Sequence, residues 1–209
     1  MPKLWIIGAS HTNRIARHLR AQGYEIINRS RIGANYSQLD LTPFSQASEQ
    51  DIIICCPFSN SIIKKSIEIE HQLKYLHATS SILSLVKWIH LTSFIPENQI
   101  MLNDMYEDYA DRVKNCKAKV FTILNPYRHL LCCESHNFAG LFEWQKLQNK
   151  FIKDRTPGQI INCIGLLRHE TNHPSSMLDY QNMLIDNVHF RNEHYCLIAQ
   201  VLSDRCRMN

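Results

Sequence analysis

The stretch KLWIIGAS, from Lys3 to Ser10, decides the fold class, because an apolar run passes directly into a glycine and then a serine. The residues Lys3–Ile7 predict a short strand that ends at Gly8. Beyond the serine, apolar residues return at the spacing of one helix face, so a helix is expected to follow the turn. The chain therefore opens with a predicted strand–turn–helix unit.

Four further apolar runs predict strands, with helices between them. The predicted strands are Glu25–Asn28, Asp51–Cys56, Lys117–Leu124 and Ile160–Leu167. The predicted helices are 62–88 (one or two), Asn98–Asn115, Phe138–Phe151 and Asn192–Leu202. Because strands that alternate with helices form a parallel sheet with helices on both faces, the chain is predicted to be an α/β protein.

Length and composition predict a single globular domain, residues 1–209. Apolar residues make up 44% of the chain and charged residues 20%, which is ordinary for a globular protein. The net charge is +4 and the lysines and arginines are scattered, so a nucleic-acid partner is possible but not indicated.

The sequence also predicts a cytoplasmic protein without a membrane span. No apolar run approaches the ~20 residues of a membrane helix, and the apolar start of the chain is too short for a signal-peptide core. Most of the eight cysteines lie within apolar predicted strands or side by side in the sequence, which favours reduced thiols.

Polar residues that could carry chemistry lie next to these predicted elements. Ser10, Gly33 and Asn60 follow the first three strands, and Asp186 and His189 precede the last helix. Ligands of open α/β sheets bind beyond the carboxyl ends of the strands, so these residues are candidates for one site. A carboxylate three residues before a histidine can orient the imidazole toward a nucleophile. Simpler interpretations stay open: Ser10 as a helix cap, Gly33 as a turn residue and Asn60 as a loop cap.

In this order the residues resemble the four short blocks of the SGNH (GDSL-like) hydrolase family. The similar segments are Gly8-Ala9-Ser10 for the serine block, Gly33 for the glycine block, Asn60 for the asparagine block and Asp186-Asn187-Val188-His189 for the Asp-x-x-His block. The resemblance implies a flavodoxin-like, three-layer α/β/α sandwich with a central, mainly parallel sheet.

The resemblance also implies hydrolysis of a carboxylic ester in a small-molecule substrate. Ser10 would be the nucleophile, His189 the general base and Asp186 its partner. The backbone N–H groups of Ser10 and Gly33, with the Asn60 amide, would form the oxyanion hole. Such a mechanism needs no metal or organic cofactor.

Three positions depart from the family pattern. Ala9 stands where the family usually has aspartate, Phe58 where the third block has glycine, and Ser61 where it has aspartate. The stretch at about 62–96 has no clear family counterpart and is expected to be a helical insertion. The departures leave a second hypothesis, a catalytically weakened binding module for RNA or a protein partner.

A third hypothesis comes from His169-Glu170-Thr171-Asn172-His173, which matches the zinc-protease pattern His-Glu-x-x-His. In such proteases both histidines lie on one face of a helix and bind the metal. Because Pro174 follows immediately, the segment His169–Ser176 is predicted to be a loop, and a zinc metalloprotease is the less favoured alternative.

Overall fold

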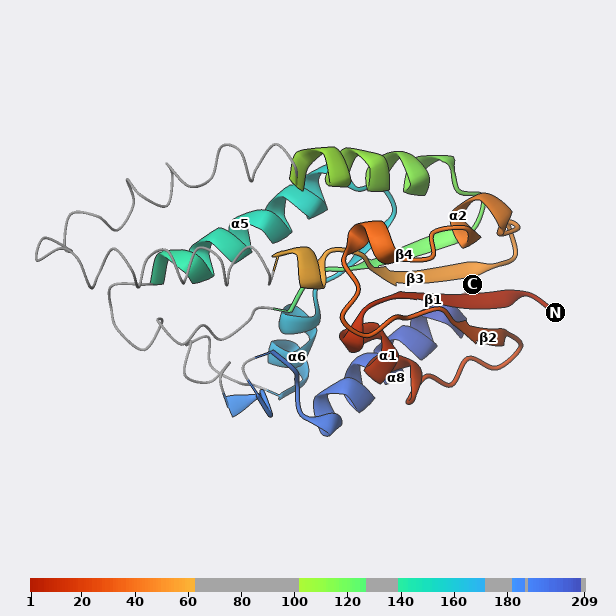
Figure 1. Cartoon of the computed structure of the whole chain (residues 1–209). Helices are drawn as coiled ribbons and strands as arrows, with labels where there is room; N and C mark the ends of the chain where they lie inside the picture. Colours follow the sequence, from red (N-terminus) through yellow and green to blue (C-terminus); the bar gives the residue numbers. More distant parts are fainter. Residues whose placement is uncertain (63–101, 127–138, 172–181, 187, 208–209) are drawn as a thin grey trace, which may run out of the picture.

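The computed structural model describes residues 1–62, 102–126, 139–171, 182–186 and 188–207 (Figure 1). Within them lies a five-stranded parallel sheet in the order β2-β1-β3-β4-β5. The strands are β1 (Lys3–Gly8), β2 (Glu25–Asn28), β3 (Ile52–Cys56), β4 (Lys119–Ile123) and β5 (Gln159–Ile161). All five predicted strands are present, although β5 is much shorter than expected.

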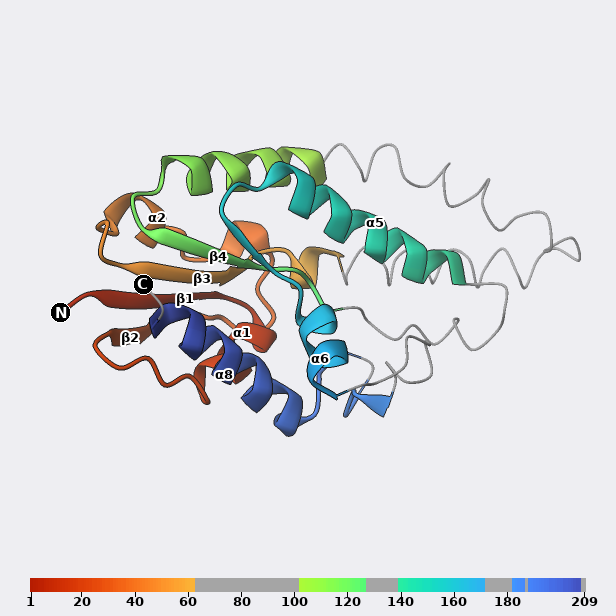
Figure 2. The same ribbon diagram turned by 180° about the vertical axis from the view of Figure 1, so that it is seen from behind.

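Helices cover both faces of this sheet. The described helices are α1 (Ser10–Ala16), the 3-10 helix η1 (Tyr36–Gln38), α2 (Pro43–Gln46), the helical residues 59–62, an unlabelled helix at 102–115, α5 (Ala139–Arg155), α6 (Cys163–Thr171) and α8 (Asn192–Arg207). Figures 1 and 2 show α1, α6 and α8 on one face, and α5 with the helix 102–115 on the other. The predicted three-layer α/β/α sandwich is confirmed.

The strand side chains alternate between two hydrophobic cores, as the two-residue period of a strand requires. On β1, Leu4 and Ile6 point to the α1–α8 side, whereas Trp5 and Ile7 point to the opposite core. Ile6 is paired in register with Ile54 of β3, so equivalent positions of neighbouring strands reinforce the same core.

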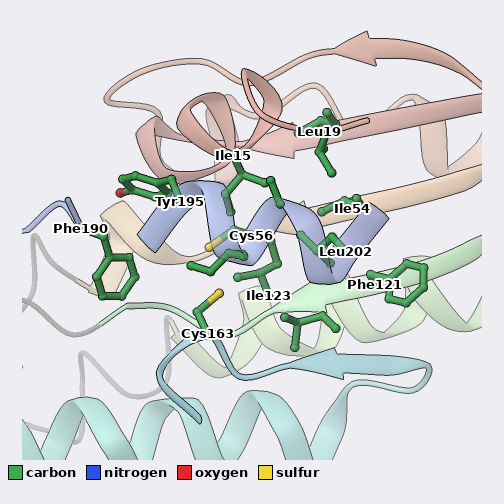
Figure 3. Close-up of a cluster of buried hydrophobic side chains, with 14 of the residues drawn as sticks. Ile15, Leu19, Ile54, Cys56, Phe121, Ile123, Cys163, Phe190, Tyr195 and Leu202 are labelled. Atoms are coloured by element: carbon green, nitrogen blue, oxygen red, sulfur yellow. The ribbon is translucent and has the colours of Figure 1, made fainter. Parts of the chain in front are cut away.

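The core beneath α1 and α8 fixes the two helices that flank the candidate site. Ile15 of α1 and Leu202 of α8 are at most 1% exposed and belong to the same cluster as Ile54 (Figure 3). Burying a side chain of this size contributes roughly 1.5–3 kcal/mol relative to leaving it in water. The two ends of the chain are thereby held together around β1.

The prediction of a strand over Ile160–Leu167 is wrong beyond Ile161. The helix α6 begins there, and Asn162 accepts a hydrogen bond from the N–H of Gly165 at 3.1 Å, as a helix cap does. A short apolar run does not by itself distinguish a strand from a buried helix. The residue that indicates a helix start in this run is Asn162.

The loop prediction for His169–Ser176 is also wrong at its start, because α6 continues through Thr171. The rest of that segment, including His173, lies outside the described residues, as does nearly all of the predicted insertion at 62–96. Among the helices that the structure does describe, none has both the length and the apolar character needed to cross a membrane.

We expect Gly8→Ala to lower the free energy of unfolding by about 1–3 kcal/mol. Gly8 has a φ of +146°, and an added Cβ would lie 2.6 Å from Oγ1 of Thr12 and 2.8 Å from the carbonyl oxygen of Cys56. Chemical denaturation should show a larger loss than in Gly23→Ala, where φ is also positive but an added Cβ meets nothing within 4 Å. Equal losses in the two variants would mean that the close approach at Gly8 is unimportant.

Candidate active site

Ser10 lies where β1 has ended and α1 begins. The cap position of α1 is occupied by Ala9, so Ser10 is the first residue of the helix and not its cap. The carbonyl of Ala9 accepts hydrogen bonds from the N–H of Asn13 at 3.1 Å and the hydroxyl of Thr12 at 2.9 Å. Because Asn13 and Thr12 supply the hydrogen bonds of this first turn, the Ser10 hydroxyl is not used within it and can make a tertiary contact.

That contact is a line of hydrogen bonds through His189 to Asp186. Oγ of Ser10 lies 2.9 Å from Nε2 of His189, and Nδ1 of His189 lies 2.8 Å from Oδ2 of Asp186. The structure thus brings together three residues that the sequence predicts to act together. It is a geometry suited to proton transfer from the hydroxyl to the imidazole.

The carboxylate of Asp186 is held by its own turn. Its second oxygen, Oδ1, accepts hydrogen bonds from the N–H groups of Val188 at 2.7 Å and His189 at 2.6 Å. Burial alone would raise the pKa of Asp186, but the hydrogen bonds from the His189 side chain and from these N–H groups outweigh it and lower the pKa. The carboxyl group therefore stays ionised, and the 50% exposure of its side chain to water also favours the charged form.

A second histidine, His11, packs against the first. The ring centroids of His11 and His189 are 5.3 Å apart, and Nδ1 of His11 is hydrogen-bonded to the hydroxyl of Tyr195 at 2.6 Å. Burial, with the nearby His189 and Arg14, lowers the pKa of His11 to about 3, although Asp186 acts in the opposite direction. His11 is therefore a neutral ring that supports one side of the His189 imidazole.

A cavity of about 390 Å³ opens beside Ser10, and the other two candidate residues, Gly33 and Asn60, line it. Its lining residues are Ser10, Asn13, Arg14, Arg17, Ile32, Gly33, Asn60, Val188 and His189. A volume of this size suits a small molecule. The Ser10, Gly33, Asn60 and His189 that the sequence grouped thus face one space.

Asn60 is anchored at the edge of this cavity. Its Nδ2 donates a hydrogen bond to the carbonyl of Ala34 at 3.0 Å, which links the helical residues 59–62 after β3 to the loop that contains Gly33. An amide nitrogen has two N–H groups, so this bond leaves one N–H for a ligand in the cavity. Gly33 has a φ of +77°, a conformation that side chains rarely adopt, and it shapes the same wall.

Two of the departures from the family pattern have structural roles here. Phe58 is fully buried, with its ring centroid 4.8 Å from that of Tyr106 and 5.1 Å from that of Tyr36. The hydroxyl of Ser61 accepts a hydrogen bond from the N–H of Tyr36 at 3.3 Å. Both contacts tie the segment that carries Asn60 to the fold.

A larger cavity, of about 580 Å³, lies at the other end of the sheet and is lined by residues 44–50, Asn115 and Lys117. These residues precede β3 and β4, so the cavity lies at the amino ends of the strands. Ligands of such sheets bind at the carboxyl ends, where Ser10 lies. The smaller cavity is therefore the better candidate site.

Comparison with known proteins identifies the fold. No family model matches the sequence, and no curated protein matches it either. A solved structure from Slackia heliotrinireducens, named as a candidate SGNH hydrolase, is similar with a TM-score of 0.52 at 13% identity, covering 98% of this chain and 97% of that one. A Bacillus subtilis protein is similar with a TM-score of 0.54 at 9% identity, covering 99% of this chain but 56% of the other.

These similarities show that the chain has an SGNH hydrolase fold, as the sequence motifs predict. At such low identity they speak for the fold alone. The chemistry must be argued from the residues of this chain.

Three residues of the site were missed in the sequence: His11, Arg14 and Arg17. His11 follows Ser10 directly, but its contact with Tyr195 joins residues 184 positions apart and has no local signal. Arg14 and Arg17 stand four and seven positions after Ser10, which is the spacing of one helix face. That spacing could have identified them.

Proposed function

We propose that the chain is a serine hydrolase that cleaves a carboxylic ester of a small molecule. The observation that carries the proposal is the line of hydrogen bonds from Ser10 through His189 to Asp186. It opens onto a cavity at the carboxyl ends of the strands. The SGNH hydrolase fold supports the same reaction class.

In the proposed reaction, Ser10 Oγ attacks the ester carbonyl carbon while Nε2 of His189 takes up its proton. The ionised Asp186 holds the ring and stabilises the imidazolium that forms. His189 then returns the proton to the leaving alcohol, and water, activated by the same imidazole, releases the acid from Ser10. The N–H groups of Ser10 and Gly33 and the amide of Asn60 would bind the oxyanion.

The binding-module hypothesis is less well supported by the same geometry. A domain that only binds RNA or a protein has no need for a hydroxyl, an imidazole and a carboxylate in hydrogen-bonded sequence. The metalloprotease hypothesis has no comparable support, because His173 lies outside the described residues.

A fluorophosphonate probe tests the proposal directly, because an activated serine oxygen displaces its fluoride and forms a stable phosphonate ester. Intact-protein mass spectrometry should show one adduct on the wild type and none on Ser10→Ala. Ser45→Ala, which removes a hydroxyl from the larger cavity, serves as the control and should still be labelled. Labelling that persists in Ser10→Ala, or that is absent from the wild type, would refute the assignment of the nucleophile.

A further inference from the structure

Two arginines line the same cavity as the proposed nucleophile. Arg14 and Arg17 stand one helical turn apart and share a helix face with Ser10. The described residues that line this cavity include no aspartate or glutamate. The space beside the Ser10 hydroxyl is therefore bounded by positive charge.

Neither arginine is in an ion pair with a carboxylate among the residues that the structure describes. Four other described arginines do have such partners: Arg29 with Asp40, Arg112 with Asp108, Arg155 with Glu107 and Arg207 with Asp204. Arg20 and Arg191 instead donate hydrogen bonds to backbone carbonyls. Among the described residues, therefore, no carboxylate pairs with either guanidinium group at the cavity.

Arg14 is also held in place. Its guanidinium carbon lies 5.8 Å from the ring centroid of Tyr195, within the range of a cation–π contact. The Tyr195 side chain is itself buried, and its hydroxyl is hydrogen-bonded to Nδ1 of His11. A cation that is positioned before the ligand arrives loses less conformational freedom on binding.

We propose that Arg14 and Arg17 bind an anionic group of the substrate, so that the ester cleaved at Ser10 carries a carboxylate or a phosphate. The proposal rests on the function proposed above and narrows its substrate class. A guanidinium presents paired N–H donors that match the oxygens of either anion. The uncharged liners Ile32 and Val188 leave room for the neutral part of the molecule.

Two esters of equal acyl length provide the test: para-nitrophenyl butyrate, which is neutral, and para-nitrophenyl hemisuccinate, which ends in a carboxylate. The wild type should have the higher kcat/KM for the hemisuccinate. In the Arg14→Gln/Arg17→Gln double variant, the ratio of kcat/KM for hemisuccinate to that for butyrate should fall about 10- to 100-fold. In Arg20→Gln, which removes a nearby charge outside the cavity lining, the ratio should not change.

Further measurements show which half of the ester carries the anionic group and whether that group is a carboxylate or a phosphate. If it belongs to the alcohol half, the same loss appears with para-carboxyphenyl acetate compared with phenyl acetate. Inorganic phosphate that inhibits the wild type more strongly than acetate at equal ionic strength indicates a phosphate. A ratio that is the same in the wild type and the double variant with both ester pairs overturns the proposal.

Binding separates this proposal from the catalytic one. The Ser10→Ala chain should bind monomethyl succinate or inorganic phosphate in titration calorimetry, and the Ser10→Ala/Arg14→Gln/Arg17→Gln chain should bind neither. If the wild type cleaves no ester but the two Ser10→Ala chains still differ in anion binding, the proposed hydrolysis is wrong and the anion site is supported. If neither chain binds an anion, the anion site fails, whatever the catalytic result.

Discussion

His189→Ala is expected to lower kcat for an activated ester by about 10⁴-fold or more, as removal of the base in serine hydrolases does. Nε2 of His189 is the group that lies 2.9 Å from Oγ of Ser10, and without it the hydroxyl must lose its proton to water. Steady-state hydrolysis of para-nitrophenyl butyrate measures the loss. The matched control is His18→Ala, because His18 contacts Asn192 and does not line the cavity.

A double variant shows whether Ser10 and His189 act as a unit. If the imidazole works only by activating the hydroxyl, Ser10→Ala/His189→Ala should be no slower than either single variant. Losses that multiply would mean that the two residues contribute separately, and the proton-transfer mechanism would be wrong. A His189→Ala chain with wild-type kcat would exclude His189 as the base.

The sequence was most informative where local pattern and tertiary environment agree. Ile52–Cys56 is apolar throughout, and it forms a central strand buried on both faces. Gly8 in the sequence predicted a turn between the first strand and α1. In the structure its φ is positive, a conformation that glycine adopts readily. The Asp186–His189 spacing predicted a carboxylate that orients the imidazole, and Oδ2 of Asp186 lies 2.8 Å from Nδ1 of His189.

The sequence was least informative where a residue depends on a distant partner. His11 reads locally as one more residue of a short helix, and its burial follows from the packing of α8 against α1. The prediction of the boundary between β5 and α6 was wrong for another reason. The apolar run Ile160–Leu167 fits two periods, and only the side chain of Asn162 decides between them.

The second large expected effect is a loss of stability in mild acid that originates at His11. In the unfolded chain its pKa should be near the ordinary ~6.5, whereas burial first, and then the charges of His189 and Arg14, lower it to about 3 in the folded protein. Between these values the unfolded chain binds a proton that the folded chain does not. The free energy of unfolding should therefore fall as the pH falls, by about 2–3 kcal/mol from pH 7 to pH 4.5 at this one residue.

Denaturant unfolding of the wild type and His11→Asn at both pH values isolates this contribution. The asparagine amide occupies the position of Nδ1, so it retains a hydrogen-bonding group for the Tyr195 hydroxyl, but it does not titrate. Carboxylates whose pKa is lowered in the folded chain, such as Asp186, also lower the free energy of unfolding as the pH falls. That contribution should be the same in both proteins. The wild type should consequently lose about 2–3 kcal/mol more than His11→Asn over this range. Equal losses would show that His11 takes up its proton in the folded protein, and that the ring beside His189 is charged in mild acid.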